Sequence, residues 1–510
     1  MKMRLELRWY IFVTVVSLLV LWPLLRSGFY VSDDGEWMVI RLSAFYQSLA
    51  EGQFPVRFLG RLNNSYGYPV ANFLYPGFLY IGSLLHFLGL SFVNSIKIIL
   101  GASVVGAALF LFASLRRSFS PLSSFIGVFS FLTAPYLAFD LYKRGSVGEI
   151  LALLGAAMAI WSLEAGYVLV FPLAIALGVV SHNSLALLFT IFFCVYLLVA
   201  RRFNWFIHVA IGLGLSAFFW IPAIVERHLV KFSSLRISNP RQYFVTLQNI
   251  DDLGLLFIAA SIVYLVMRVH RSSSWGRGIY TGGFFVGLFL ASPWSEMIWN
   301  NPVFARLFQF PFRMLAIVLL CGPWLIAHSV EHLRSVRGKL VGLYIVLGLL
   351  SLVPILTSIN FVDRPEGYYA TNEGTTTVAD EYMPKWVRSN VTERNSNRIE
   401  IFQGRGTIVP RLVNTQSVDA TLILEADSII GVNTIYYPGW GVTIDDHPTS
   451  VDYKNDRGLM RVNVPRGTHH LVAEFRETPL RFVADSVSVA SFIIYVLVIA
   501  KSVFVKRQRS

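Results

Sequence analysis

Residues 165–200 read AGYVLVFPLAIALGVVSHNSLALLFTIFFCVYLLVA, and these 36 residues contain no Asp, Glu, Lys or Arg. The hydrocarbon core of a bilayer is about 30 Å thick, so a helix needs roughly 20 largely apolar residues to cross it. One polar segment, Ser181-His182-Asn183-Ser184, interrupts the stretch near its middle. The stretch therefore predicts two membrane-crossing helices joined by a tight turn.

The composition of the whole chain agrees with this prediction. Of the 510 residues, 55% are hydrophobic and 14% are charged, whereas about 25% are charged in ordinary soluble domains. These values exclude a disordered chain, a coiled coil and a typical soluble enzyme, and they fit a polytopic membrane protein. Both cysteines, Cys194 and Cys321, lie in apolar runs, which excludes a disulfide framework.

Further apolar runs predict a polytopic α-helical membrane protein with about twelve transmembrane helices. Each run should be helical, because lipid offers the backbone no hydrogen-bond partners. One more run, 70–90, has Pro76, Gly77 and Gly82 in its middle and is interpreted as interfacial or re-entrant. The predicted spans are 9–25, 94–115, 121–139, 147–164, 166–181, 184–200, 204–224, 253–270, 278–295, 311–331, 340–358 and 485–505.

Charge sets the orientation of these spans. With twelve spans, the segments on one side carry 17 basic residues and three acids, and the positive-inside rule makes that side cytoplasmic. If 70–90 also crossed, every later basic cluster would move outside. Both termini are thus predicted to be cytoplasmic, in a protein of the cytoplasmic membrane, and the net charge of +13 needs no nucleic-acid partner. The basic start before the first span, with no small-residue cleavage site after it, predicts an uncleaved signal anchor.

The predicted organisation has three parts. Residues 1–358 form a transmembrane domain, whose first outer loop, 26–93, carries interfacial helices. Residues 359–484 have a soluble composition, with short β-branched and aromatic runs between turn signals, which predicts an extracytoplasmic β-sandwich-like domain. Residues 485–510 form a last transmembrane helix and a basic cytoplasmic tail. The predicted strands are 421–424, 429–437, 459–464 and 469–475.

Three acids stand just past the first span, in Ser32-Asp33-Asp34-Gly35-Glu36-Trp37. Asp34 or Asp33 could act as a general base. Asp33, Asp34 and Glu36 could also hold a divalent cation such as Mg²⁺ or Mn²⁺. The alternative is a helix N-cap followed by acids in a first turn. Both interpretations stay open, since a capping residue can also face a cavity.

Further polar residues gather on the predicted outer side. Arg41, Arg57, Arg144 and Arg313 could bind phosphate, and the alternatives are headgroup anchoring and a salt bridge of Arg144 with its neighbouring acids. Tyr68 suits a sugar face or an interfacial aromatic belt. Asp140, Glu149 and His182 stand at helix junctions, and His182 could bind a ligand or be a buried, hydrogen-bonded histidine.

The motifs that the sequence lacks exclude several classes of function. The sequence has no phosphate-binding Walker loop, no dinucleotide glycine motif and no zinc-type Cys/His spacing. Ionisable residues near mid-span, which ion-coupled transporters usually carry, are few. The polar residues gather instead at the outer ends of the predicted helices, which indicates a site at that interface.

Several motifs follow one another along the chain. They are Asp34-Gly35 with Arg41; Gly52-Gln53-Phe54-Pro55 with Arg57; Tyr66-Gly67-Tyr68-Pro69 with Asn72; Asp140-Leu141-Tyr142 with Arg144 and Glu149; His182-Asn183; Phe310-Pro311 with Arg313; Glu381-Tyr382-Met383-Pro384; and Tyr436-Tyr437-Pro438-Gly439-Trp440. In these motifs the sequence resembles the GT-C fold membrane glycosyltransferases that use polyprenyl-phosphate sugars. More narrowly, it is similar to the bacterial membrane proteins labelled "6-pyruvoyl-tetrahydropterin synthase-related" and to YfhO-like proteins. Where related sequences often carry histidines around the aspartate, this chain has Asp33 and Met38.

This resemblance implies an integral-membrane glycosyltransferase that uses a polyprenyl-phosphate sugar donor and a cell-surface glycan, lipid or protein as acceptor. Asp34 or Asp33 would take the acceptor proton. Arg144, with Arg57 or Arg313, would stabilise the leaving phosphate. Arg41 would assist at the phosphate, and Asp140, Glu149, His182, Tyr68 and Asn72 would bind substrate. A transporter or flippase of lipid-linked glycans and a non-catalytic membrane scaffold remain the alternatives.

Overall fold

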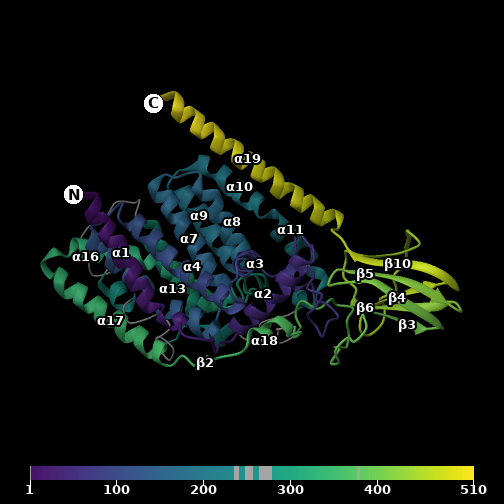
Figure 1. Cartoon of the computed structure of the whole chain (residues 1–510). Helices are drawn as coiled ribbons and strands as arrows, with labels where there is room; N and C mark the ends of the chain where they lie inside the picture. The colour runs from purple at the N-terminus through teal and green to yellow at the C-terminus, as the bar shows by residue number, and fades with distance from the viewer. Residues whose placement is uncertain are drawn as a thin grey trace.

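The computed structural model describes residues 2–234, 240–246, 257–263, 278–375, 380–389 and 391–509. It is mostly helical and has a β-rich region at one end (Figure 1). The helices are α1 (Lys2–Val20), α2 (Gly35–Ala50), α3 (Gly77–Phe87), α4 (Phe92–Leu115), α5 (Pro121–Leu132), α6 (Pro135–Ala138), α7 (Val147–Ala165), α8 (Val170–Ser181), α9 (Asn183–Val199), α10 (Phe206–Leu215), α11 (Ala217–Val225), α13 (Gly278–Ala291), α14 (Glu296–Trp299), α15 (Pro302–Phe308), α16 (Leu315–His332), α17 (Arg337–Thr357), α18 (Glu366–Thr371) and α19 (Pro479–Arg509).

The described helices include five that are long and apolar enough to cross a membrane, or seven if each of two bent pairs is one span. Three predicted spans, 166–181, 184–200 and 278–295, correspond to shorter apolar helices, namely α8, α9 and α13. The predicted span 253–270 falls largely outside the described residues. The number of twelve spans therefore stays a prediction.

The run 70–90 folds as a short turn and an 11-residue helix, α3. At 1.5 Å per residue this helix is about 16 Å long, roughly half of a bilayer core. It packs against α2 and α4, and Gly82 lies so close to Leu42 that an added Cβ would meet that side chain at 2.7 Å. A helix of this length suits the interfacial interpretation.

Two pairs of consecutive helices meet at a sharp bend, and each pair provides a group that bears on the site. Between α10 and α11 the axis turns by 72°. Pro222 lies inside α11 and has no N–H for the carbonyl of Phe218. That carbonyl instead accepts a hydrogen bond of 2.7 Å from Nη1 of Arg57. The other pair bends by 45° before a π-helix, η3 (Phe139–Arg144), which carries two of the predicted site residues.

The β-rich region consists of two antiparallel sheets. One has the strand order β4-β5-β10-β7-β8 and the other β3-β6-β9, and their apolar side chains share one core. The four predicted strands coincide with β5 (Ser417–Leu424), β6 (Ser428–Ile435), β9 (Leu459–Val464) and β10 (Gly467–Phe475), while the sequence analysis did not predict β3 (Ile399–Gln403), β4 (Gly406–Val413), β7 (Trp440–Ile444) and β8 (His447–Thr449).

The first part of the predicted 359–484 domain lies along the helical body (Figure 1). The strand β2 (Phe361–Val362) pairs antiparallel with β1 (Phe29–Tyr30) of the first loop, and α18 packs on α2. Farther on, the backbone of residues 381–385 pairs with residues 229–232. This stretch thus contributes to the helical body before the chain enters the sheets.

A buried ion cluster joins the helical body to the β-rich region. Glu226 accepts hydrogen bonds from Nη2 of Arg481 at 2.9 Å, from the Tyr437 hydroxyl at 2.8 Å and from Nδ2 of Asn72 at 2.7 Å. Arg481 is fully buried. Three sequence-distant segments and the start of α19 meet in this cluster, so it holds the two parts of the molecule together.

Candidate functional site

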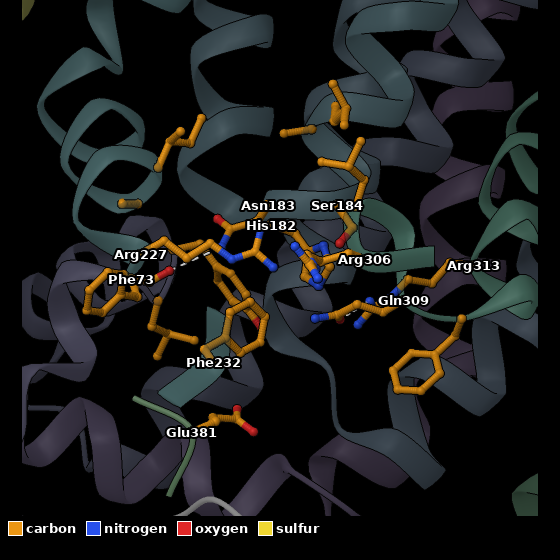
Figure 2. Close-up of a pocket in the computed structure, with 18 of the residues that line it drawn as sticks. Phe73, His182, Asn183, Ser184, Arg227, Phe232, Arg306, Gln309, Arg313 and Glu381 are labelled. Carbon is orange, nitrogen blue, oxygen red and sulfur yellow. Dashed lines mark hydrogen bonds between the residues drawn. The ribbon is translucent and has the colours of Figure 1, made fainter. Parts of the chain in front are cut away.

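The helical body contains a cavity of about 1430 Å³ (Figure 2). A polar belt includes His182, Arg227, Arg306 and Arg313, and Figure 2 shows these side chains at one level of the cavity. An apolar wall comes mainly from α8, α9, α10 and α11, and Ile224 of this wall is exposed. The wall residues are Val179, Leu187, Leu213, Trp220, Ala223 and Ile224.

Asp34 is placed by a close contact between two loops. Its backbone N–H donates to the Arg144 carbonyl at 2.8 Å, and the N–H of Asp33 donates to the Lys143 carbonyl at 2.9 Å. Gly145 has a φ of +65°, and an added Cβ there would stand 2.6 Å from the backbone of Gly35. Because both positions are glycine, the first loop approaches η3 closely enough to set Asp34 beside Arg144.

The carboxylate of Asp34 does not cap the helix that it precedes. Asp34 is the N-cap residue of α2, but the Gly35 N–H donates to Oγ of Ser32 at 3.1 Å. The side chain of Asp34 instead lines the cavity together with Asp33. Burial raises the pKa of the Asp34 carboxyl above its ordinary value, with the positive charges of Arg144 and Arg41 acting in the opposite direction.

A buried glutamate behind the cavity lining, Glu149, holds three of the lining side chains in place. Oε1 of Glu149 accepts from Nη1 of Arg144 at 2.7 Å and from Nε of Arg313 at 2.9 Å. Nε2 of His182 lies 3.4 Å from the same oxygen, and its Nδ1 accepts from the Leu185 N–H at 3.2 Å. Because Nδ1 accepts a hydrogen bond, the proton of a neutral His182 stands on Nε2, the ring nitrogen that lies near Glu149.

Two arginines keep a free edge toward the cavity. Nη1 of Arg144 is shared by Asp140 at 2.7 Å and Glu149, which is the salt bridge that the sequence analysis kept as an alternative. Its Nε and Nη2, and Nη2 of Arg313, have no hydrogen-bond partner in the described part of the chain. The guanidinium of Arg144 lies over the Phe312 ring, and that of Arg313 over Phe310. The two rings are stacked 5.2 Å apart. Both guanidinium groups are thus fixed, with N–H groups left for an anion.

The structure brings together six of the predicted site residues and places the others elsewhere. Arg57 pairs with Glu477 at 3.1 Å and Asp485 at 2.8 Å, outside the cavity lining. Asp140 and Glu149 lie behind Arg144, Asn72 belongs to the Glu226 cluster, and the Tyr68 hydroxyl accepts from the Tyr382 N–H at 3.0 Å. The predicted residues that line the cavity are Asp33, Asp34, Arg41, Arg144, His182 and Arg313.

Of the three acids of the first loop, Asp33 and Asp34 line the cavity and Glu36 does not. Oε1 of Glu36 accepts from Nε of Arg364 at 2.8 Å and from the Tyr369 hydroxyl at 3.0 Å. Across the described residues, no three His, Cys, Asp or Glu side chains form a group that could hold a metal ion. Asp33 and Asp34 alone offer carboxylate oxygens to a cation, which would need further ligands from water or substrate.

Three ionisable residues of the cavity were not predicted as site residues: Arg227, Arg306 and Glu381. Arg227 and Arg306 follow apolar runs on the predicted outer side, where the positive-inside rule makes arginine unusual. Their position on that side could therefore have indicated them as site residues. Glu381 comes from the segment before the β-rich region. Burial raises the pKa of its carboxyl; the positive charge of Arg41 opposes this effect and the negative charge of Asp34 adds to it.

Solved structures of membrane glycosyltransferases are similar to this chain. Arabinofuranosyltransferase AftD from mycobacteria has 16% identity and a TM-score of 0.45, over 69% of this chain and 26% of AftD. ArnT from Cupriavidus metallidurans, bound to undecaprenyl phosphate, has 16% identity and a TM-score of 0.43, over 71% of this chain and 68% of ArnT. The oligosaccharyltransferase AglB from Archaeoglobus fulgidus, in complex with an inhibitory peptide and a dolichol-phosphate, has 13% identity and a TM-score of 0.44, over 72% of this chain and 56% of AglB.

These neighbours are GT-C glycosyltransferases, and this chain spans about a quarter of the length of AftD. No protein-family model matches the sequence, and no curated protein matches it. The narrower resemblance to YfhO-like proteins therefore stays a prediction. Because the identities are low and the TM-scores lie below 0.5, the proposal that follows is drawn from the contents of the cavity.

Proposed function

We propose that the protein is an integral-membrane glycosyltransferase. It moves a sugar from a polyprenyl-phosphate donor to a glycan, lipid or protein acceptor at the cell surface. One observation carries this proposal: a single cavity holds fixed arginines with free N–H groups, an apolar wall that includes the exposed Ile224, and the partly buried carboxylate of Asp34. A polyprenyl-phosphate sugar matches these three features. Its apolar chain suits the wall, its phosphate suits the arginines, and its sugar places the reacting carbon near a carboxylate.

The donor lies with its isoprenoid chain along the apolar wall. Exposed Ile224 marks the place where such a chain passes between the cavity and the lipid. The phosphate takes the N–H groups of Arg144 and Arg313, which are fixed by Glu149 and by their stacked rings. Because these groups are fixed before the reaction, they stabilise the charge that develops on the leaving phosphate without reorganising.

Asp34 acts as the general base. The acceptor hydroxyl oxygen attacks the anomeric carbon while the bond from that carbon to the phosphate oxygen breaks. The hydroxyl proton goes to the Asp34 carboxylate, and the bonding electron pair leaves with the polyprenyl phosphate. Asp33 is the alternative base, since both side chains line the cavity. A divalent cation, Mg²⁺ or Mn²⁺, held by these two carboxylates remains part of the proposal.

The reaction takes place on the extracytoplasmic face, with both termini in the cytoplasm. Two observations support this orientation. Figure 1 shows the N- and C-terminal ends together, at the end of the helical body away from the β-rich region. Basic loop residues pair with acids of the predicted cytoplasmic segments, as Arg116 does with Glu6 at 2.5 Å and Arg337 with Glu331 at 3.4 Å.

The decisive test is the variant Asp34→Asn in the full-length protein, reconstituted in liposomes. The donor is the lipid-linked sugar that accumulates in cells lacking the protein, identified by mass spectrometry. We expect transfer to fall by about 10²- to 10⁴-fold, because the variant lacks the base. Glu36→Gln is the matched control: it removes an acid two residues away that faces Arg364, and it should retain transfer.

Unchanged transfer in Asp34→Asn would show that Asp34 is not the base. The same assay separates the alternative functions. Label that crosses the bilayer without release of polyprenyl phosphate would indicate a flippase. If replacing Asp33, Asp34 and Arg144 together left the cellular phenotype intact, the protein would be a scaffold.

A further inference from the structure

The cavity contains a second pair of arginines, apart from the pair that Glu149 holds. Arg227 stands on η5 (Glu226–Leu229), directly after α11, and Arg306 stands on α15. Both line the cavity and lie close enough for the charge of Arg306 to act on Arg227. Figure 2 shows both side chains in the polar belt. Within the described residues, neither forms an ion pair or hydrogen bond.

The position of Arg227 is fixed without any acid. Its guanidinium lies 4.9 Å from the centre of the Phe232 ring. Phe232 stacks on Tyr382 at 5.5 Å, and Tyr382 stacks on Phe73 at 5.8 Å, with interplanar angles of 14° and 13°. Its Nε is buried and makes no hydrogen bond to a described residue. The guanidinium is therefore held at the end of a stack of three rings, with unused N–H groups.

The other charges of the cavity are already matched. Arg144 and Arg313 face the buried acids Asp140 and Glu149. Arg41 acts on Asp34 and Glu381, which line the same cavity. This leaves Arg227 and Arg306 as two neighbouring positive charges that pair with no acid of the described ranges.

Such an arrangement does not stabilise the fold. Two like charges repel each other, and partial burial removes water from one of them. An anion between them would relieve both effects. Planar guanidinium groups bind phosphoryl oxygens through paired N–H groups, and a phosphoryl group carries up to two negative charges.

We propose that Arg227 and Arg306 form a subsite for a second phosphoryl group, in addition to the donor phosphate at Arg144 and Arg313. This inference rests on the proposed function, and it adds to it the class of substrate. The second phosphoryl group belongs either to a polyprenyl diphosphate donor or to a phosphorylated acceptor. Both sources present the same chemistry to the two arginines.

The test measures binding to the purified full-length protein in lipid nanodiscs. The probes are undecaprenyl phosphate, undecaprenyl diphosphate and, with undecaprenyl phosphate present, glucose 6-phosphate against glucose. The test variant is Arg227→Gln/Arg306→Gln. The matched control is Arg388→Gln/Arg411→Gln, which removes the same charge from the exposed surface beyond the cavity. Melting temperatures are measured for all proteins.

We expect the wild type to bind either undecaprenyl diphosphate more tightly than undecaprenyl phosphate, or glucose 6-phosphate more tightly than glucose. The affinity should differ by about tenfold or more, because hydrogen bonds between charged groups are strong enough for this. The Arg227→Gln/Arg306→Gln variant should lose this preference, retain its affinity for undecaprenyl phosphate and melt no lower than the wild type. A lost preference for the diphosphate assigns the group to the donor. A lost preference for glucose 6-phosphate assigns it to the acceptor.

Three results would overturn the proposal. In the first, the wild type shows neither preference, and in the second, the variant keeps the preference of the wild type. In the third, the Arg227→Gln/Arg306→Gln variant loses as much affinity for undecaprenyl phosphate as Arg144→Gln/Arg313→Gln does, which would place both arginine pairs on one phosphate. A wild-type protein that binds no undecaprenyl phosphate at all would contradict the proposed function instead, so the two failures are distinguishable.

Discussion

Two buried glutamates, Glu149 and Glu226, have similar partners and different surroundings. Each accepts from an arginine, and each has a tyrosine hydroxyl nearby, Tyr136 at 3.3 Å for Glu149 and Tyr437 at 2.8 Å for Glu226. The arginine of Glu226, Arg481, is fully buried and away from the cavity lining, whereas those of Glu149 line the cavity. A buried ion pair thus joins parts of a fold when its cation is enclosed, and prepares a binding site when the cation keeps an accessible edge.

The largest effect is expected at the enclosed cluster. Arg481→Met leaves Glu226 buried without its cation, which costs about 3–5 kcal/mol in comparable cases. We expect a large fall in the melting temperature of the purified protein. Glu226→Gln/Arg481→Met removes both charges and should recover most of the loss. If Arg481→Met melted like the wild type, the cluster would not hold the two parts together.

A smaller effect, on binding, should separate two arginines that the sequence analysis treated alike. Arg144→Gln removes N–H groups that face the cavity, so the Kd for undecaprenyl phosphate should rise by about tenfold or more. Arg57→Gln breaks contacts with Glu477, Asp485 and the Phe218 carbonyl outside the cavity. It should lower the melting temperature and leave this Kd unchanged. Equal losses of affinity would place Arg57 at the donor phosphate.

The smallest effect is a pH dependence at Asp34. Its pKa is raised above 3.8 in the folded protein, so the ionised carboxylate costs stability at neutral pH. The protonated Asp34 carboxyl stabilises the folded protein fully at a pH below the pKa that this group has in the unfolded chain. This contribution to the free energy of unfolding is lost as the pH rises through the higher pKa of the folded protein. Asp34→Asn should therefore melt at the same temperature as the wild type or slightly higher at pH 7, with the difference vanishing toward pH 4. A lower melting temperature at pH 7 would indicate a structural role.

The sequence predicted the helical body, the β-rich region and the first-loop acid because these depend on local patterns. Apolar runs, turn signals and acids beside glycine can each be recognised within a few residues. The division of the arginines could not be predicted in the same way. Arg57 and Arg144 stand in similar polar loops. The Phe218 carbonyl, Glu477 and Asp485 hold Arg57 outside the cavity lining, whereas Glu149 holds Arg144 at the cavity.

The segment around Glu381 has a consequence for biosynthesis. Its backbone is held by residues 229–232, and Tyr382 completes the ring stack against Phe73. The ribosome must therefore reach Tyr382 before this wall of the cavity exists. A nascent or prematurely terminated copy that ends after α17 would therefore have a cavity that is open on one side.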